Sequence, residues 1–250
     1  MNLSLGLSLP AIAARPAGGG GGAAVVAIAG TPAGLGTSGA HTTVEVADYN
    51  HAGGTNSALL VVVDGRPQEG GEQAVSVTWN GVAVPERVDS SDLAGVSANK
   101  AFVWIGLLAG AAAGIKTLAV AFDKAQSDSV VHLLSLVNVD QAAPVVGVAS
   151  TSDTNEGAAV ATAGRTGASP ANLFVAGAGI SVGSTLAGLT AGWSEVLTGK
   201  SDTGTSTSTC TLTTAARAPS ATEADALTVT FADSTTRARG LALVEVKAAA

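Results

Sequence analysis

Short apolar runs, separated by Gly, Pro, Asn and Asp, repeat along the chain after residue 24. Runs of this kind at roughly 8 to 12 residue spacing predict antiparallel strands in two packed sheets. Helical periodicity is confined to Ser90–Ala98 and Ala215–Ala226. The pattern therefore predicts an all-β, antiparallel β-sandwich of jelly-roll type. Its strands are expected at Val25–Ile28, Thr43–Val46, Leu59–Val63, Val75–Trp79, Val82–Val84, Phe102–Leu108, Leu118–Phe122, Val131–Val139, Leu173–Val175, Ser194–Leu197, Leu227–Phe231 and Leu241–Val246.

Two turns are predicted beside these strands. Strict alternation over Val75–Trp79 is followed by Asn80–Gly81, the dipeptide most typical of a two-residue hairpin turn. The buried-looking run Leu59–Val63 is followed by Asp64–Pro67, whose composition is typical of a turn that ends a strand. The long polar stretches 150–170 and 200–224 are expected to be loops or weak strands.

The chain begins with a segment of different character, which divides it into an N-terminal arm, 1–23, and a sandwich domain, 24–250. Apolar residues alternate with small or polar ones in the arm, as in a strand that adds to a partner's sheet, at Leu3, Leu5, Leu7 and Leu9. Five glycines then predict a hinge, at Gly18, Gly19, Gly20, Gly21 and Gly22. The alternative is an export signal cleaved after Ala13 or Ala14, although the first basic residue, Arg15, follows the apolar stretch.

Other interpretations of the arm lack their required residues. A phosphate-binding loop needs Lys followed by Ser or Thr after the glycines, and neither follows Gly22. No apolar run in the chain reaches the roughly 18 to 20 residues that a membrane-spanning helix requires. We therefore expect no membrane span.

The negative net charge of the chain argues against a nucleic-acid partner. The 250 residues carry a net charge of −7 and only 12% charged residues, so the positive surface that nucleic acid needs is missing. A surface of Ala, Gly and Thr is buried at little desolvation cost, which favours a homo-oligomer. Cys210 is the only cysteine, so neither an intrachain disulfide nor a zinc cluster is expected, and no cofactor or metal is predicted.

Three segments resemble a β-sandwich module of phage virion proteins and bacterial extracellular proteins. They are the hairpin at Val77–Val84, the strand pair Val103–Leu108 with Gly114–Phe122, and the strand end Leu134–Pro144. In that family a V-x-[WY]-N-G hairpin, a W-x-L strand and a V-D-Q-x-x-P strand end recur in this order. The match covers roughly residues 57 to 200. Such modules serve as non-enzymatic building or adhesion units in tail fibres, head decorations and cell-surface proteins.

The resemblance and the arm together lead to a functional expectation. The chain is expected to be a structural bacteriophage protein of the virion, in a tail-fibre, minor tail or head-decoration position. The arm would join it to other capsid or tail proteins, and the sandwich would contribute to binding of the host surface. The alternative is a secreted or cell-surface bacterial module that binds glycans and whose N-terminus is an export signal.

The chain contains one short match to a catalytic motif. Gly179–Gly183 matches the G-x-S-x-G nucleophile elbow around Ser181, but no histidine follows His132 to complete a triad. His132 shares a strand face with leucines, so a core position is expected for it. His41 and His51 have no metal-ligand spacing, and calcium-type loop acids such as Asp153, Glu156 and Asp202 form no D-x-D-x-D-G loop. The sequence predicts no enzyme and no catalytic residue.

The three tryptophans are the candidates for a flat sugar-binding surface. Trp79 and Trp104 lie within apolar strand patterns, so both are expected in the core. Trp193 stands between Gly192 and Ser194, and it is the candidate for an exposed ring that contacts a glycan.

Overall fold

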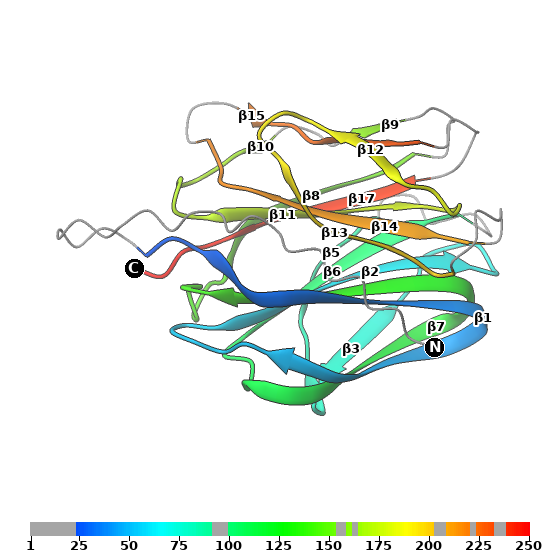
Figure 1. Ribbon diagram of the computed structural model, residues 1–250, viewed down its shortest axis with the longest axis horizontal. Coiled ribbons are helices and arrows are strands. Elements are labelled where there is room, and N and C mark those ends of the chain that lie inside the picture. The colour runs from blue at the N-terminus through cyan, green and yellow to red at the C-terminus, as the bar shows by residue number, and fades with distance from the viewer. Residues whose placement is uncertain are drawn as a thin grey trace.

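The computed structural model describes residues 24–91, 100–153, 159–161, 165–202, 209–220, 224–232 and 239–250. Nearly all the regular structure in these ranges is β-strand, and every pair of neighbouring strands is antiparallel. The strands form layers that are stacked on one another (Figure 1). The predicted all-β, antiparallel sandwich is therefore confirmed.

The first sheet contains the strands of the N-terminal half of the chain. Its hydrogen-bonded order is β4-β3-β7-β2-β6-β5, and β1 pairs with β7. The strands are β1 (Ala27–His51), β2 (Ala58–Pro67), β3 (Val75–Trp79), β4 (Val82–Ala83), β5 (Glu86–Asp89), β6 (Phe102–Ala109) and β7 (Gly114–Val137).

Two very long strands make this sheet curl. β1 follows β7 along almost its whole length, and its register shifts four times on the way. On the other side of β7, residues 126–136 pair with β2, and residues 118–122 pair with β3. The two strands predicted at Leu118–Phe122 and Val131–Val139 are thus one bent strand, because pairing with β1 carries the polar residues between them across the bend. The curled part forms the lower layer of Figure 1.

The second sheet contains strands of the C-terminal half in the order β13-β14-β11-β17-β8. These are β8 (Val145–Asp153), β11 (Leu173–Ile180), β13 (Ser194–Lys200), β14 (Thr211–Arg217) and β17 (Arg239–Val246). The expected helix at Ala215–Ala226 is wrong where it begins, since Ala215 and Ala216 lie inside β14. Nearly all of the other expected helix, Ser90–Ala98, lies outside the described residues.

A small third sheet covers the outer face of the second. Its order is β12-β16-β9, with β12 (Leu186–Leu189), β16 (Thr228–Phe231) and β9 (Ala159–Ala161). A two-stranded ribbon joins β10 (Arg165–Thr166) to β15 (Ala224–Asp225). β9 and β12 are visible in the uppermost layer of Figure 1.

The described residues form three hydrophobic cores. The core between the two main sheets contains Leu60, Val62 and Leu134 from the first sheet, and Val175 and Val244 from the second. Neighbouring residues of the same strands point to the opposite side, since side chains alternate along a strand. A second core thus fills the curl of the first sheet, and a third lies under the small sheet.

The Asn80–Gly81 hairpin is confirmed. Trp79 pairs with Val82, and Asn80 and Gly81 have φ values of 48° and 81°, which the favoured two-residue turn requires. The turn predicted at Asp64–Pro67 is wrong, because β2 continues through it. Asp64 pairs with Val103 on one side and with Val130 on the other, so it lies in the middle of the sheet.

The connectivity refines the jelly-roll expectation. A jelly roll is built from two Greek keys whose strands are shared between its two sheets. Here β1 to β7 complete the first sheet before β8 begins the second. The sheets are therefore consecutive in the sequence, although strands that pair within each sheet, such as β2 with β7 and β8 with β17, lie far apart along the chain.

Candidate functional site

Hydrogen bonds fix the first residues that the structure describes. The Val26 N–H donates to the Ala171 carbonyl at 2.9 Å, and the Asn138 side-chain amide donates to the Val25 carbonyl at 2.9 Å. Val26 is buried in the core between the main sheets, whereas Val25 is 54% exposed. The predicted docking residues Leu3, Leu5, Leu7 and Leu9 and the hinge Gly18–Gly22 lie outside the described residues.

The C-terminal residues lie beside these first described residues. The Ala249 N–H donates to the Asn138 carbonyl at 2.8 Å, and the Lys247 N–H donates to the Pro144 carbonyl at 2.9 Å. Main-chain hydrogen bonds thus join the C-terminal residues to Asn138 and to the start of β8, and the Asn138 side chain joins Val25 to the same group.

The V-D-Q-x-x-P segment shapes the same end. Asp140 accepts hydrogen bonds from the N–H groups of Ala142 and Ala143, both at 2.9 Å, and forms an ion pair with Lys247 at 2.6 Å. The Lys247 hydrogen bond, followed by the two backbone bonds, lowers the pKa of Asp140 to about 2. This part of the motif therefore closes a turn, and its carboxylate is already occupied.

Trp193 does not present an open ring. Its side chain is 7% exposed and stacks on Phe174, with ring centroids 6.1 Å apart and planes inclined by 22°. The expectation of an exposed ring is wrong because the small third sheet encloses the core that contains Trp193. Trp79 and Trp104 are each 1% exposed, which confirms their expected core positions.

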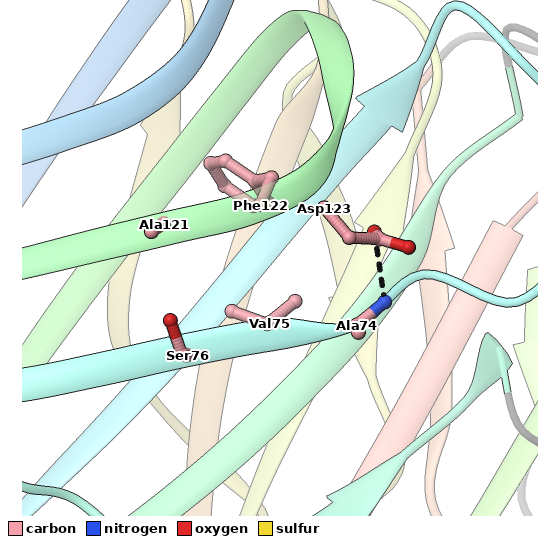
Figure 2. A pocket seen from close by; sticks show the side chains of 6 residues that line it. All are labelled: Ala74, Val75, Ser76, Ala121, Phe122 and Asp123. Atoms are coloured by element: carbon pink, nitrogen blue, oxygen red, sulfur yellow. Dashed lines mark hydrogen bonds between the residues drawn. The ribbon is translucent and has the colours of Figure 1, made fainter.

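Two open hollows lie side by side on the outer face of the curled sheet. The first, of about 260 Å³, is bounded by β3 and β7, and Figure 2 shows Asp123 beside it, accepting a 3.0 Å hydrogen bond from the Ala74 N–H. The second, of about 320 Å³, is lined by Thr43, Val44, Glu45, Ser76, Thr78, Ala119, Val120 and Ala121. Their linings offer hydroxyl and carboxylate oxygens and contain no histidine or cysteine.

A buried hydrogen-bonded centre lies inside the curl, around Ser135. Its hydroxyl bonds to the Tyr49 hydroxyl at 3.0 Å, to His51 Nδ1 at 2.8 Å and to the Ala52 N–H at 3.0 Å. Three bonds use the full capacity of a hydroxyl group. Burial raises the pKa of Tyr49 and lowers that of His51.

This Ser–His pair is a structural device in the described fold. Ser135 and His51 are each 1% exposed, and Tyr49 is 6% exposed, so a substrate has no access to the serine oxygen. The three bonds hold the end of β1 against β7. Sequence analysis did not find this centre, although a lone serine within the apolar run Val130–Val137 was a visible signal.

The core between the main sheets contains carboxyl groups. Asp128 is held by Arg66 Nη1 at 3.2 Å and by the Ser201 hydroxyl at 2.9 Å. Asp64 is fully buried, and no N–H or O–H group among the described residues donates to either of its oxygens. The pKa of Asp64 is raised well above its ordinary value, chiefly by burial. A hydrogen bond from the Cys210 thiol lowers this pKa in part, and the negative charge of Asp128 raises it.

Histidine and serine candidates from the sequence lie in separate places. His132 is fully buried, as expected, with Nδ1 bonded to Thr214 Oγ1 at 2.9 Å. His41, in β1, bonds through Nε2 to the Ser129 hydroxyl of the neighbouring strand β7 at 2.8 Å. Ser181 is 3% exposed, and the chain after it continues to strand β12 instead of the helix that a nucleophile elbow needs.

The described ranges contain neither a metal-binding cluster nor a membrane-spanning helix. No three His, Cys, Asp or Glu side chains there are grouped in a way that could hold a metal ion. Glu156 and the side chain of Asp153 lie outside what the structure describes. In the same ranges, no helix is long and apolar enough to cross a membrane.

These features define the class of protein as an antiparallel all-β sandwich. No family model matches the chain, and no curated protein matches it. Two solved structures show a distant likeness. The X-ray structure of Melon necrotic spot virus has 11% identity and a TM-score of 0.23, covering 90% of this chain and all of that one. The PBSX exported protein XepA has 12% identity and a TM-score of 0.21, covering 89% and 86%. These TM-scores are too low to assign a shared fold or function.

Proposed function

We propose that the chain is a structural component of a bacteriophage or phage-like virion, in a tail-fibre, minor tail or head-decoration position. Its role is assembly without catalysis, and it is located in the particle as an oligomer. The arm joins it to other virion proteins. This proposal rests on the arm itself, an alternating leucine segment and a glycine run that precede the fixed residues Val25 and Val26 in the sequence.

Two further observations support an assembly role. The module resemblance falls on segments that build the sandwich, namely the Asn80–Gly81 hairpin and the Asp140 turn. Buried polar groups such as Ser135 and Ser181 are enclosed in the fold, so the surface of the described chain offers hollows and edges for contact. The glycan-binding alternative loses its main support, because Trp193 is buried.

Deletion of residues 1–22 tests the proposal. The truncated chain is expected to be lost from purified particles while keeping the far-UV circular dichroism and cooperative unfolding of the full chain. A second variant keeps the full length and the glycines and changes the arm leucines to Ser, at Leu3, Leu5, Leu7 and Leu9. It is also expected to be lost from particles, which would assign the effect to the leucines and not to the length of the arm. Undiminished incorporation of both variants would contradict the proposal. Mass spectrometry of the N-terminus adds a second check, because cleavage after Ala13 or Ala14 would indicate export.

A further inference from the structure

The edges of the two main sheets differ in their protection. An unpaired strand edge is a template for pairing with another chain, and proteins usually blunt it with charges, bulges or short length. β4 has two residues, and β5 has four, with a register shift and the charged residues Glu86 and Arg87. β13 has a register shift between Glu195 and Leu197. It also lies against β1, because Leu197 of β13 is close to Gly34 of β1. The register of β1 itself shifts four times.

β8 lacks these features over most of its length. It pairs only with β17 among the described strands, and its register is regular from Gly147 to Asp153. No charged residue occurs between Val145 and Ser152. Val146 and Val148 are 38% and 42% exposed, although Val148 pairs with the fully buried Val244. Its apolar face therefore continues the core between the sheets and is left partly uncovered at the edge.

The chain itself contains a segment that fits this edge. Residues 3–9 have no charge and alternate leucine with serine or glycine, so one face of a strand formed there is entirely leucine. Paired antiparallel with Val146–Ser152, these seven residues would cover most of β8. In an antiparallel register that places Leu7 beside Val148 and Leu9 beside Val146, these two leucines extend the core past its present edge, and Leu5 and Leu3 lie beside Ser150 and Ser152.

The connection favours a neighbouring copy as the donor. Fourteen residues, 10–23, separate Leu9 from the first described residue. Hairpin connections usually take 2 to 5 residues, and structureless loops above roughly 12 to 15 residues are uncommon within a domain. Extended, these residues span about 46 Å, which is enough to reach another molecule.

We propose that residues Leu3–Leu9 of one copy add as an antiparallel strand to the open edge of β8 in a neighbouring copy. This inference rests on the proposed function in one respect, because it identifies a second copy of this chain as a partner of the arm. The interaction combines backbone hydrogen bonds with burial of leucine beside Val146 and Val148, as in other strand additions.

Disulfide trapping between two purified full-length variants tests this pairing. One carries Leu7→Cys and the other Val148→Cys, and they are mixed before mild oxidation. Paired strands bring opposite Cα atoms within the separation that a disulfide needs. A covalent dimer is expected in the mixture and absent from either variant alone. Native Cys210 is fully buried, and the unmixed samples measure any contribution from it.

Matched controls identify the face and the acceptor. Ser8→Cys in the arm points to the opposite face, and Val82→Cys is an exposed position on β4, so both are expected to give only background dimer. Trapping with Leu5→Cys instead of Leu7→Cys would indicate a shifted register of the same pairing. No dimer in either mixture, or a dimer from Val148→Cys alone, would overturn the inference, the latter by showing that two β8 strands pair with each other.

Molar mass by light scattering provides an independent readout. Val148→Lys places a charge on the edge and is expected to reduce the full-length oligomer to monomer, whereas Val82→Lys is expected to leave it intact. An unchanged oligomer in Val148→Lys would count against β8 as the acceptor. Trapped dimers together with undiminished particle incorporation of the arm deletion would reject the proposed function and keep this inference. Loss of the arm deletion from particles, with no trapped dimer, would keep the proposed function and reject this inference.

Discussion

Two buried polar centres of this molecule are satisfied to very different degrees. Inside the curl of the first sheet, Ser135 makes three hydrogen bonds, to Tyr49, His51 and Ala52. Between the main sheets, Asp64 receives no hydrogen bond from a described N–H or O–H group. Both side chains are at most 1% exposed. A buried polar group contributes to stability only when it is paired, so the two centres are expected to affect stability in opposite directions.

Removal of the Ser135 hydroxyl is expected to have the largest effect. Ser135→Ala leaves the Tyr49 hydroxyl, His51 Nδ1 and the Ala52 N–H without their partner at once. Each unpaired buried group costs about 1–3 kcal/mol, so we expect a loss of about 4 kcal/mol in the free energy of unfolding. Urea denaturation followed by tryptophan fluorescence measures this loss.

Ser129→Ala is the matched control for this prediction. Ser129 is fully buried in the same strand, and its hydroxyl is bonded to a single side chain, His41, at 2.8 Å. A loss of about 1 kcal/mol is expected there. Equal losses for the two serines would show that the number of partners does not set the effect.

His132, which also lies between the main sheets, is an intermediate case with one bonded nitrogen. Its Nδ1 is bonded to Thr214, its Nε2 has no partner among the described residues, and burial lowers its pKa from 6.5 to about 3. Between these values the unfolded chain binds more protons than the folded chain, so stability falls as the pH falls. From pH 7 to pH 4 this amounts to about 3 kcal/mol.

The variant His132→Asn tests the pH dependence. The amide of Asn remains neutral over the whole range, so the difference in stability between pH 7 and pH 4 is expected to shrink by about 3 kcal/mol relative to the wild type. Denaturation at both pH values measures the slope and separates it from the packing cost of the smaller side chain. An unchanged slope would mean that His132 is not the group responsible.

Asp64 is expected to show the smallest effect and the opposite sign. Its folded pKa is raised above the unfolded value, so its contribution to stability is greatest below the unfolded pKa and is lost as the pH rises toward the folded one. Asp64→Asn removes ionisation and keeps an uncharged side-chain oxygen beside the Cys210 thiol. We expect it to stabilise the protein at pH 7 by roughly 1–2 kcal/mol and to give no gain at pH 3. Thermal unfolding at both pH values measures the difference, and a loss at pH 7 would show that the interactions of the carboxyl group outweigh the cost of its burial.

The sequence predicted the features that depend on local pattern. The Asn80–Gly81 hairpin follows from residues that tolerate positive φ, and the core positions of Trp79, Trp104 and His132 follow from side-chain alternation along strands. The all-β class follows from the same alternation. Each of these properties is decided within a few neighbouring residues.

Other features depended on contacts between distant segments. Asp64 had the composition of a turn, but pairing with Val103 and Val130 keeps it in the sheet. Trp193 had small, polar neighbours, but Phe174 and the small third sheet cover its ring. The candidate acceptor strand β8 could not be identified as an edge from its sequence, because edge position depends on which strands pair.

The sequence by itself determined the strand class, the main hairpin and the composition of the arm, since alternation and turn chemistry are local properties. The tertiary structure alone decided that two predicted strands are the single bent β7 and that the two sheets are consecutive in the chain. It also decided that Ser135 makes three hydrogen bonds, whereas no described N–H or O–H group donates to Asp64. The physical reason is that sheet pairing and burial are set by residues far apart in the sequence, and the same polar side chain is stabilising or costly according to the partner it meets there.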